Sequence, residues 1–143
     1  MGVRTLGSGD EEVSRRACRR FGHAGDLDPG VFLARPEALL LVAEDGPELV
    51  GWAYGHELVH PHGERTMLLY ALDVTEDARR QGHGTALVTS FVEHARRRGC
   101  TEVWVLTDDE NQAGLATYAA SGGQREPDSP VMFVWNHTDG RGA

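Results

Sequence analysis

The sequence predicts an α+β domain, a mixed α/β sandwich in which helices cover a central sheet. Strand and helix signals follow one another in the order β-α-α-β-β-β-α-β-α-β. Two apolar runs are joined by Asp45-Gly46-Pro47, which is typical of a β-hairpin. The chain has 143 residues, of which 40% are hydrophobic and 25% charged, and it shows no repeat or linker. These features favour a single domain over residues 1–143.

The N-terminal part is predicted to form a strand and two helices. Residues 3–6 are a short strand candidate, and apolar residues recur at helical spacing over 11–21. Turn signals at Asp28-Pro29-Gly30 and the break at Pro36 leave room only for a short second helix.

The middle of the chain is predicted to form three long strands. The stretches "ALLLVAED" (38–45) and "ELVGWAYGHEL" (48–58) are the arms of the hairpin, and "RTMLLYALDV" (65–74) is the third strand. The histidine-containing loop between the second and third strands holds His60 and His62, with His56 shortly before it. No regular ligand motif accompanies these histidines, so no metal site is expected.

The C-terminal part begins with the clearest helix, predicted over 82–98 and stopped by Gly99. The stretch "TEVWVLT" (101–107) is apolar on both faces, which indicates a strand buried inside the sheet. The remaining elements are a helix over 113–121, a strand over 130–135 and a polar, loose tail over 136–143.

Composition limits the class of partner. Lys and Arg total 14 against 22 Asp and Glu, a formal charge of −8, which argues against nucleic acid and favours cationic ligands. Solubility alone would also account for this acidity. No window is apolar enough to span a bilayer, and the start of the chain lacks a secretory signal, so a cytoplasmic protein is expected. Cys18 and Cys100 are expected to be reduced.

Two glycines stand where the clearest helix begins, although glycine is a poor helix former. The first turn of a helix leaves N–H groups unpaired, and Gly82 and Gly84 would let a phosphate approach them closely. Arg79 and Arg80 would add positive charge at the rim. A P-loop would need a lysine after Gly84, and a dinucleotide fingerprint would need glycine in place of Leu87.

The spacing Arg79-x-x-Gly82-x-Gly84 resembles the acetyl-CoA signature of the GCN5-related N-acetyltransferases. The stretch "LTDDENQAGLATYAASGG" resembles the second cofactor segment of that family, with Asn111, Tyr118 and Gly122 in register. Segments such as "LLYALDVTEDARRQG" are similar to the aminoglycoside 3-N-acetyltransferase branch, the gentamicin and fortimicin type. The resemblance implies a mostly antiparallel sheet, splayed in the middle, with helices on both faces, and a homodimer.

The resemblance also implies a set of cofactor contacts. Acetyl-CoA is expected to contact Leu72, Asp73, Val74, Arg79, Arg80, Gln81, Gly82, His83, Gly84, Thr85, Asn111 and Tyr118. Within this set, the backbone N–H of Val74 is the expected donor to the thioester carbonyl, and Tyr118 the expected acid for the leaving sulfur. A tyrosine that only packs in the core is the alternative interpretation of Tyr118.

The general base is less clear, because the aminoglycoside branch has an aspartate in "Tyr-Asp-Leu-Ala-Val" where this chain has Ala71. Asp73 lies two residues further on and therefore on the same face of the strand. It would orient the amine or accept its proton, unless it is simply a solvent-facing strand residue. The expected acceptor contacts are Glu57, Tyr70, Asp73, Asp108, Asp109 and Glu110. Helix capping is the alternative role for the acids at 108–110.

The sequence therefore predicts an acetyl-CoA-dependent N-acetyltransferase that acts by direct attack of an amine in a ternary complex. The resemblance implies a cationic small molecule as acceptor, with an aminoglycoside antibiotic as the leading candidate and antibiotic resistance as the consequence. One alternative is another amine, such as a polyamine, an amino-acid derivative or a protein N-terminus. A non-catalytic acyl-CoA-binding sensor is the other.

Overall fold

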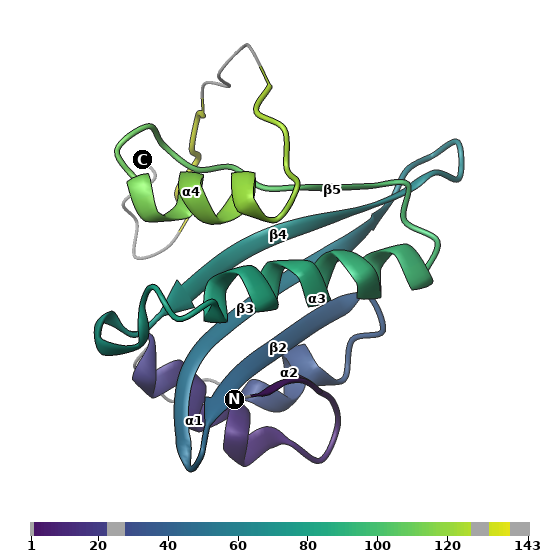
Figure 1. Ribbon diagram of the computed structural model, residues 1–143. Helices are drawn as coiled ribbons and strands as arrows, with labels where there is room; N and C mark the ends of the chain where they lie inside the picture. Colours follow the sequence, from purple (N-terminus) through teal and green to yellow (C-terminus); the bar gives the residue numbers. More distant parts are fainter. Residues whose placement is uncertain (1, 23–27, 127–131, 138–143) are drawn as a thin grey trace.

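A five-stranded sheet forms the centre of the computed structural model, which describes residues 2–22, 28–126 and 132–137 (Figure 1). The strands lie in sequence order, and all neighbours are antiparallel except the last pair, β4 and β5, which are parallel. Their bounds are β1 Gly2–Leu6, β2 Ala38–Asp45, β3 Glu48–Val59, β4 Arg65–Val74 and β5 Glu102–Trp104. The predicted α+β class is confirmed.

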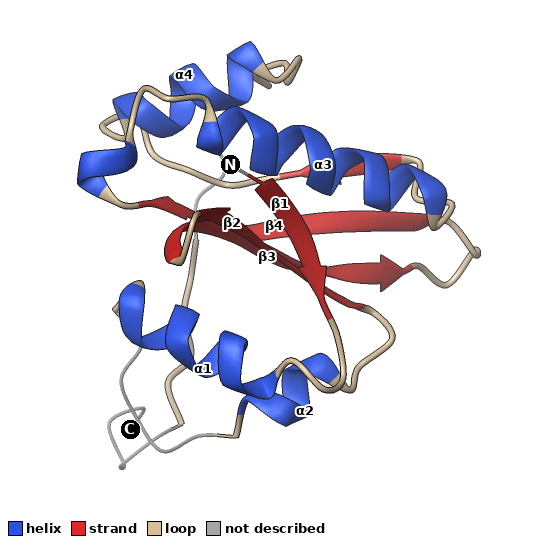
Figure 2. Cartoon of the chain, turned by 60° about the horizontal axis from the view of Figure 1, so that its bottom comes forward, coloured by secondary structure: helices blue, strands red, loops and turns tan. Residues whose placement is uncertain are grey.

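Helices cover both faces of the sheet, as Figure 2 shows. Helices α1 (Glu11–Arg20) and α2 (Pro29–Leu33) lie on one face, while α3 (His83–Arg97) and α4 (Gln112–Ala120) lie on the other. A short 3₁₀ turn, Glu76–Ala78, connects β4 to α3. None of the helices in the described ranges is both long and apolar enough to cross a membrane.

The strands bury residues on both faces because two helical layers enclose the sheet. In β2, Leu39 and Leu41 belong to the core beneath α3, whereas Leu40 and Val42 belong to the core beneath α1 and α2. This period of two follows from the pleat of a strand. The hairpin prediction is confirmed, with Gly46 at the turn in a left-handed conformation (φ +60°).

The sheet opens between β4 and β5. Their pairing covers only Thr66–Glu102, Met67–Val103 and Leu68–Trp104, although β4 continues to Val74. The predicted strand over 101–107 is therefore shorter than expected, and it lies at the edge of the sheet rather than inside it. The apolar residues after Trp104 leave the sheet, so one side of the end of β4 faces the opening.

The predicted last strand over 130–135 is not observed. Pro130 and Val131 lie outside the described residues, and residues 132–135 form no strand. These four residues are all exposed, at 80% for Met132, 78% for Phe133, 63% for Val134 and 75% for Trp135. High strand propensity does not create a strand in the absence of a partner edge.

Candidate functional site

A pocket of about 820 Å³ lies between the end of β4, the start of α3 and helix α4. All but one of the predicted cofactor contacts line it: Leu72, Asp73, Val74, Arg79, Arg80, Gly82, His83, Gly84, Thr85, Asn111 and Tyr118. The exception is Gln81, whose side-chain amide donates to the carbonyl of Asp77 at 3.4 Å. Segments some 40 residues apart in the sequence thus meet at this pocket, as the predicted motifs require.

The start of α3 offers unpaired backbone donors to this pocket. Gly82 caps the helix, and the N–H of Ala86 is bonded to the carbonyl of Gly82 at 2.9 Å. The N–H groups of His83, Gly84 and Thr85 precede that bond, so they have no partner within the helix. They lie at the positive end of the helix dipole, which favours a phosphate.

Both glycines also have local structural causes. Gly82 has φ +87°, a left-handed conformation that side chains other than glycine adopt at a cost. A Cβ on Gly84 would lie 3.3 Å from the methyl group of Thr117, so glycine lets α4 approach α3 closely. Anion binding is therefore not the only reason for glycine at these positions.

His83 is buried at 2% exposure within this pocket lining. In the described part of the chain its Nδ1 atom has no hydrogen-bond partner. A buried polar atom without a partner costs free energy, so the site suits a ligand that supplies one. The donors of α3 and this orphan nitrogen together fit a phosphorylated cofactor.

The end of β4 presents further backbone groups to the opening. The N–H of Thr75 donates to the carbonyl of Val50 at 2.8 Å, so it points toward β3. Because strand residues alternate, the N–H groups of Leu72 and Val74 point the other way, to the side that β5 has left. The carbonyl of Val74 also points there and accepts from Arg79 Nε at 3.3 Å.

Tyr118 lies on α4, half-buried, and lines the same pocket. Burial, and to a lesser degree the Asp73 carboxylate, raises the pKa of the Tyr118 hydroxyl. The raised pKa keeps the proton on the oxygen at neutral pH, as a general acid requires.

Asp73 is exposed, but its carboxylate is held by a tryptophan. Trp52 Nε1 donates to Asp73 Oδ2 at 2.8 Å across the β3–β4 pair, in which these two residues lie opposite each other. Ala71 lies opposite Tyr54 on the same face, so the two-residue shift of the carboxylate does keep it on that face. Sequence analysis did not single out Trp52 or Tyr54. The signal was present in Gly51-Trp52-Ala53-Tyr54-Gly55, where large aromatic residues alternate with small ones.

The predicted acidic residues at 108–110 do not line the pocket. Asp108 Oδ1 accepts from the N–H groups of Glu110 and Asn111, at 2.9 and 3.0 Å. Asp109 forms an ion pair with Arg125. Asp108 therefore organises the turn before α4, in keeping with the alternative interpretation of these acids.

Asn111 lines the pocket and also caps α4. Its Oδ1 accepts from the N–H of Gly114 at 3.1 Å, and its Nδ2 donates to Thr107 Oγ1 at 2.9 Å. Both ends of the side-chain amide thus have protein partners.

Glu57 lies at the other end of the sheet, opposite Met67 on β4. Met67 lies six positions before Asp73 on β4, and this spacing corresponds to a distance of about 20 Å along a strand. The Glu57 side chain is 8% exposed and pairs with Arg65 at 2.9 Å and Arg98 at 3.7 Å. This placement differs from the expectation that Glu57 meets the acceptor, because the ion pairs and the register hold it away from the pocket.

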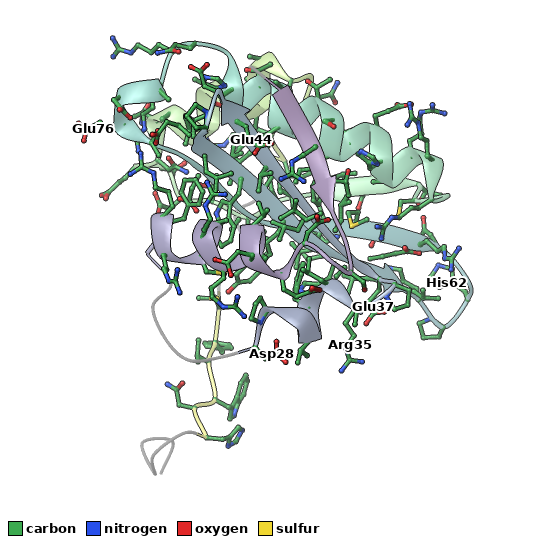
Figure 3. All side chains as sticks on the ribbon, turned by 90° about the horizontal axis from the view of Figure 1, so that it is seen from below. Asp28, Arg35, Glu37, Glu44, His62 and Glu76 are labelled. Carbon is green, nitrogen blue, oxygen red and sulfur yellow. The ribbon has the colours of Figure 1, made fainter. Side chains whose placement is uncertain are left out.

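The histidine loop lies at that far end as well. Figure 3 labels His62 at one end of the molecule and Glu76, just before α3, at the opposite end. His60 Nε2 lies 3.1 Å from Thr66 Oγ1, and His62 Nε2 lies 3.2 Å from Glu64 Oε1. Among the described residues, no group of three or more His, Cys, Asp or Glu side chains is arranged to hold a metal ion.

Comparisons with known proteins support the fold and identify a family. The region 11–122 matches the model of the acetyltransferase (GNAT) family. An aminoglycoside N(6')-acetyltransferase type 1 of Klebsiella aerogenes is 40% identical over 97 residues, which cover 63% of this chain and 61% of that protein. A mycothiol acetyltransferase of Paenarthrobacter aurescens is 33% identical over 103 residues, 68% of this chain and 30% of that protein.

The matched region thus spans less than two thirds of either curated relative. Among solved structures, an aminoglycoside acetyltransferase from an uncultured soil metagenomic sample, in complex with sisomicin, superposes with a TM-score of 0.82. It is 19% identical and 96% of each chain is covered, a likeness that supports the fold alone. The family match covers most of the chain, so the chain belongs to the acetyltransferase (GNAT) family, whose members use acetyl-CoA.

Proposed function

We propose that the chain transfers an acetyl group from acetyl-CoA to a primary amine of a cationic small molecule, with aminoglycosides as the leading acceptors. One observation carries this proposal. A single pocket brings together the unpaired start of α3, the open side of β4 and the protonated hydroxyl of Tyr118. These are the parts that a direct acyl transfer needs.

The cofactor is proposed to lie along the start of α3. The N–H groups of His83, Gly84 and Thr85 would donate to its pyrophosphate, and Arg79 and Arg80 would add charge at the exposed rim. The buried Nδ1 of His83 would gain a polar partner there. When bound, acetyl-CoA supplies the activated acetyl group.

The residues of the chain supply the rest of the chemistry. The N–H of Val74 would donate to the carbonyl oxygen of the acetyl group, where negative charge develops during the attack. Tyr118 holds the proton for the leaving sulfur. Asp73, fixed by Trp52, would orient the amine and receive its proton directly or through water.

The aminoglycoside acceptor is supported by the name of the Klebsiella aerogenes relative. That relative is of the N(6') type, so it does not support the 3-N position implied by the sequence resemblance, which stays a prediction. Mass spectrometry and NMR of the acetylated drug would distinguish the 3-N-acetylated product from the 6'-N-acetylated product. The mycothiol acetyltransferases among the relatives make another amine acceptor the second candidate.

The experiment combines binding and turnover on the purified protein. Calorimetry with CoA tests the cofactor site, and release of free thiol from acetyl-CoA tests transfer to kanamycin-like, gentamicin-like, polyamine and peptide amines. We expect CoA to bind and aminoglycosides to be acetylated. Binding without transfer to any amine would support the sensor alternative, and absence of CoA binding would contradict both.

Three further features stay predictions. The exposed apolar stretch 132–135 supports a homodimer, because a monomer would leave these four side chains in water. A cytoplasmic location is proposed from the sequence. The single domain over 1–143 is likewise proposed, with residues 138–143 of the predicted tail lying outside the described range.

A further inference from the structure

An aromatic surface borders Asp73 on the sheet face that α1 and α2 cover. The rings of Trp52 and Tyr54 pack edge to face with centroids 5.0 Å apart, and the rings of Tyr54 and Tyr70 lie 5.7 Å apart. Trp52 also donates to the Asp73 carboxylate at 2.8 Å. Three aromatic side chains and one carboxylate are thus connected by contacts.

A bulge in β4 accounts for this grouping. Tyr54 lies opposite Ala71 and the next residue, Gly55, lies opposite Leu69, so Tyr70 is the extra residue. A bulge re-aims the side chain that it displaces. Tyr70 consequently reaches the ring of Tyr54, yet it is 64% exposed.

The buried part of this surface packs against α2 and the segment after α1. Trp52 is 3% exposed and stacks on Phe21 of the segment after α1, with centroids 5.2 Å apart. Tyr54 also meets Phe32 of α2 edge to face at 5.7 Å. Burial, with smaller contributions from Tyr70 and Asp73, raises the pKa of Tyr54, so its ring stays neutral at working pH.

Asp73 connects this surface to the cofactor pocket, because it lines that pocket and accepts from Trp52. Three of the other predicted acceptor carboxylates are engaged elsewhere, Asp108 with backbone N–H groups, Asp109 with Arg125 and Glu57 with Arg65, and the fourth, Glu110, does not line the pocket. The carboxylate of Asp73 beside the exposed ring of Tyr70 would attract an ammonium group by charge and by the negative face of the ring. A sugar ring attached to that ammonium would pack its apolar C–H face against the ring of Tyr70.

We propose that Asp73, Tyr70 and Tyr54 form the acceptor site, which takes a protonated primary amine borne on a ring, as in an aminosugar, with the ring against Tyr70. Trp52 is a positioning residue that fixes the Asp73 carboxylate. This inference rests on the proposed function and names its acceptor contacts. A flexible linear polyamine has no preformed C–H ring face to pack against Tyr70 and is a poorer fit.

The test is steady-state kinetics with acetyl-CoA and kanamycin on the full chain. Tyr70→Leu keeps apolar volume but removes the ring, so the KM for kanamycin is expected to rise about tenfold while the KM for acetyl-CoA stays constant. Tyr70→Phe keeps the ring, so its KM for kanamycin is expected to rise less than that of Tyr70→Leu. Val59→Ala, an exposed apolar position at the far end of β3, is the matched control.

Trp52→Phe keeps an aromatic ring beside Phe21 but removes the donor to Asp73. We expect kcat/KM for kanamycin to fall about tenfold, because a hydrogen bond to a charged group is lost. The thermal midpoint should fall, because the smaller ring leaves core volume unfilled, but at a temperature where the variant is folded the KM for acetyl-CoA should stay constant. If kcat/KM falls equally for kanamycin and for acetyl-CoA, Trp52 has a structural role and the positioning assignment is overturned.

Binding separates this inference from the proposed function. Calorimetry of kanamycin with the CoA-loaded protein should show binding that Tyr70→Leu weakens, whether or not turnover occurs. Turnover or binding that Tyr70→Leu leaves unchanged would overturn the acceptor site alone. If CoA itself does not bind, the proposed function fails. If kanamycin binding is absent, or is not weakened by Tyr70→Leu, the acceptor-site inference fails as well.

Discussion

The surroundings of Tyr118 suit the proposed role of this residue as a general acid. Burial and the nearby Asp73 raise its pKa above the usual value of 10, so the hydroxyl keeps its proton. We predict that Tyr118→Phe lowers kcat about 100-fold, the typical contribution of a general acid. The KM for acetyl-CoA should change little, because the ring still packs against the core. Thiol-release kinetics measure both, and an unchanged kcat would remove Tyr118 from the chemistry.

The pH profile gives a second test at the same residue. A raised pKa means that Tyr118 loses its proton only at a pH above its ordinary value. The wild-type kcat should therefore show no decline from this group as pH rises from neutrality to about 10. A decline near pH 8 that disappears in Tyr118→Phe would contradict this assignment.

Arg80 combines a strained backbone with a charge at the pocket rim. Its φ is +64°, the one positive value among the described residues other than glycine. We predict that Arg80→Gly raises the free energy of unfolding by about 1 kcal/mol, because glycine adopts this conformation without a steric cost. The same change should weaken CoA binding several-fold by removing charge.

The matched control is Arg79→Gly, which removes a neighbouring charge from a residue with ordinary φ (−69°). It should weaken CoA binding without stabilising the fold. Urea unfolding and calorimetry with CoA measure the two effects. Loss of stability in Arg80→Gly would show that the arginine side chain contributes more to the fold than its conformation costs.

At the scale of elements, hydrophobic periodicity was sufficient for the hairpin of β2 and β3 and for α3, because these elements are long and strongly patterned. Periodicity failed where the pairing of strands determines whether a segment is a strand. Val105 and Leu106 read as strand residues, yet the chain has already left β4 at Trp104. Contacts between strands distant in sequence, such as that of Trp52 with Asp73, depend on a register that periodicity does not fix.

The bulge in β4 depends on a close backbone approach at Gly55. A Cβ on Gly55 would collide with the backbone carbonyl oxygen of Leu68. We predict that Gly55→Ala lowers the free energy of unfolding by about 3 kcal/mol, since backbone atoms cannot move aside as a side chain does. Urea denaturation measures the change.

Gly7→Ala is the control for that substitution, because a Cβ there meets nothing within 4 Å. Its effect should stay within about 0.5 kcal/mol. A comparable loss in both variants would indicate a general effect of replacing glycine rather than a collision at the bulge.

At the scale of the whole molecule, the sheet places sequence neighbours far apart. Glu57 and Tyr54 are three residues apart, yet only Tyr54 belongs to the aromatic surface beside Asp73, while Glu57 joins Arg65 and Arg98 at the far end. The residues named by the sequence motifs line one pocket, because they lie within short segments that the fold brings together. The proposed acceptor surface combines β3 and β4: the sequence named Tyr70 and Asp73 on β4, whereas Trp52 and Tyr54 on β3 emerged only from the fold.

The exposed stretch 132–135 makes a prediction about assembly. Phe133 and Trp135 contact each other with centroids 6.4 Å apart but remain 78% and 75% exposed, and Figure 3 shows this segment extending away from the helices and sheet. Large aromatic side chains bury about 150–250 Å² each when covered, so a second copy of the chain would gain by covering them.

We predict a dimer that Phe133→Ser combined with Trp135→Ser converts to a monomer. Sedimentation equilibrium measures the mass, with Val31→Ser, exposed on α2, as the control that leaves the dimer intact. A wild-type protein that is monomeric at every concentration would contradict the proposed assembly and leave the pocket chemistry unaffected.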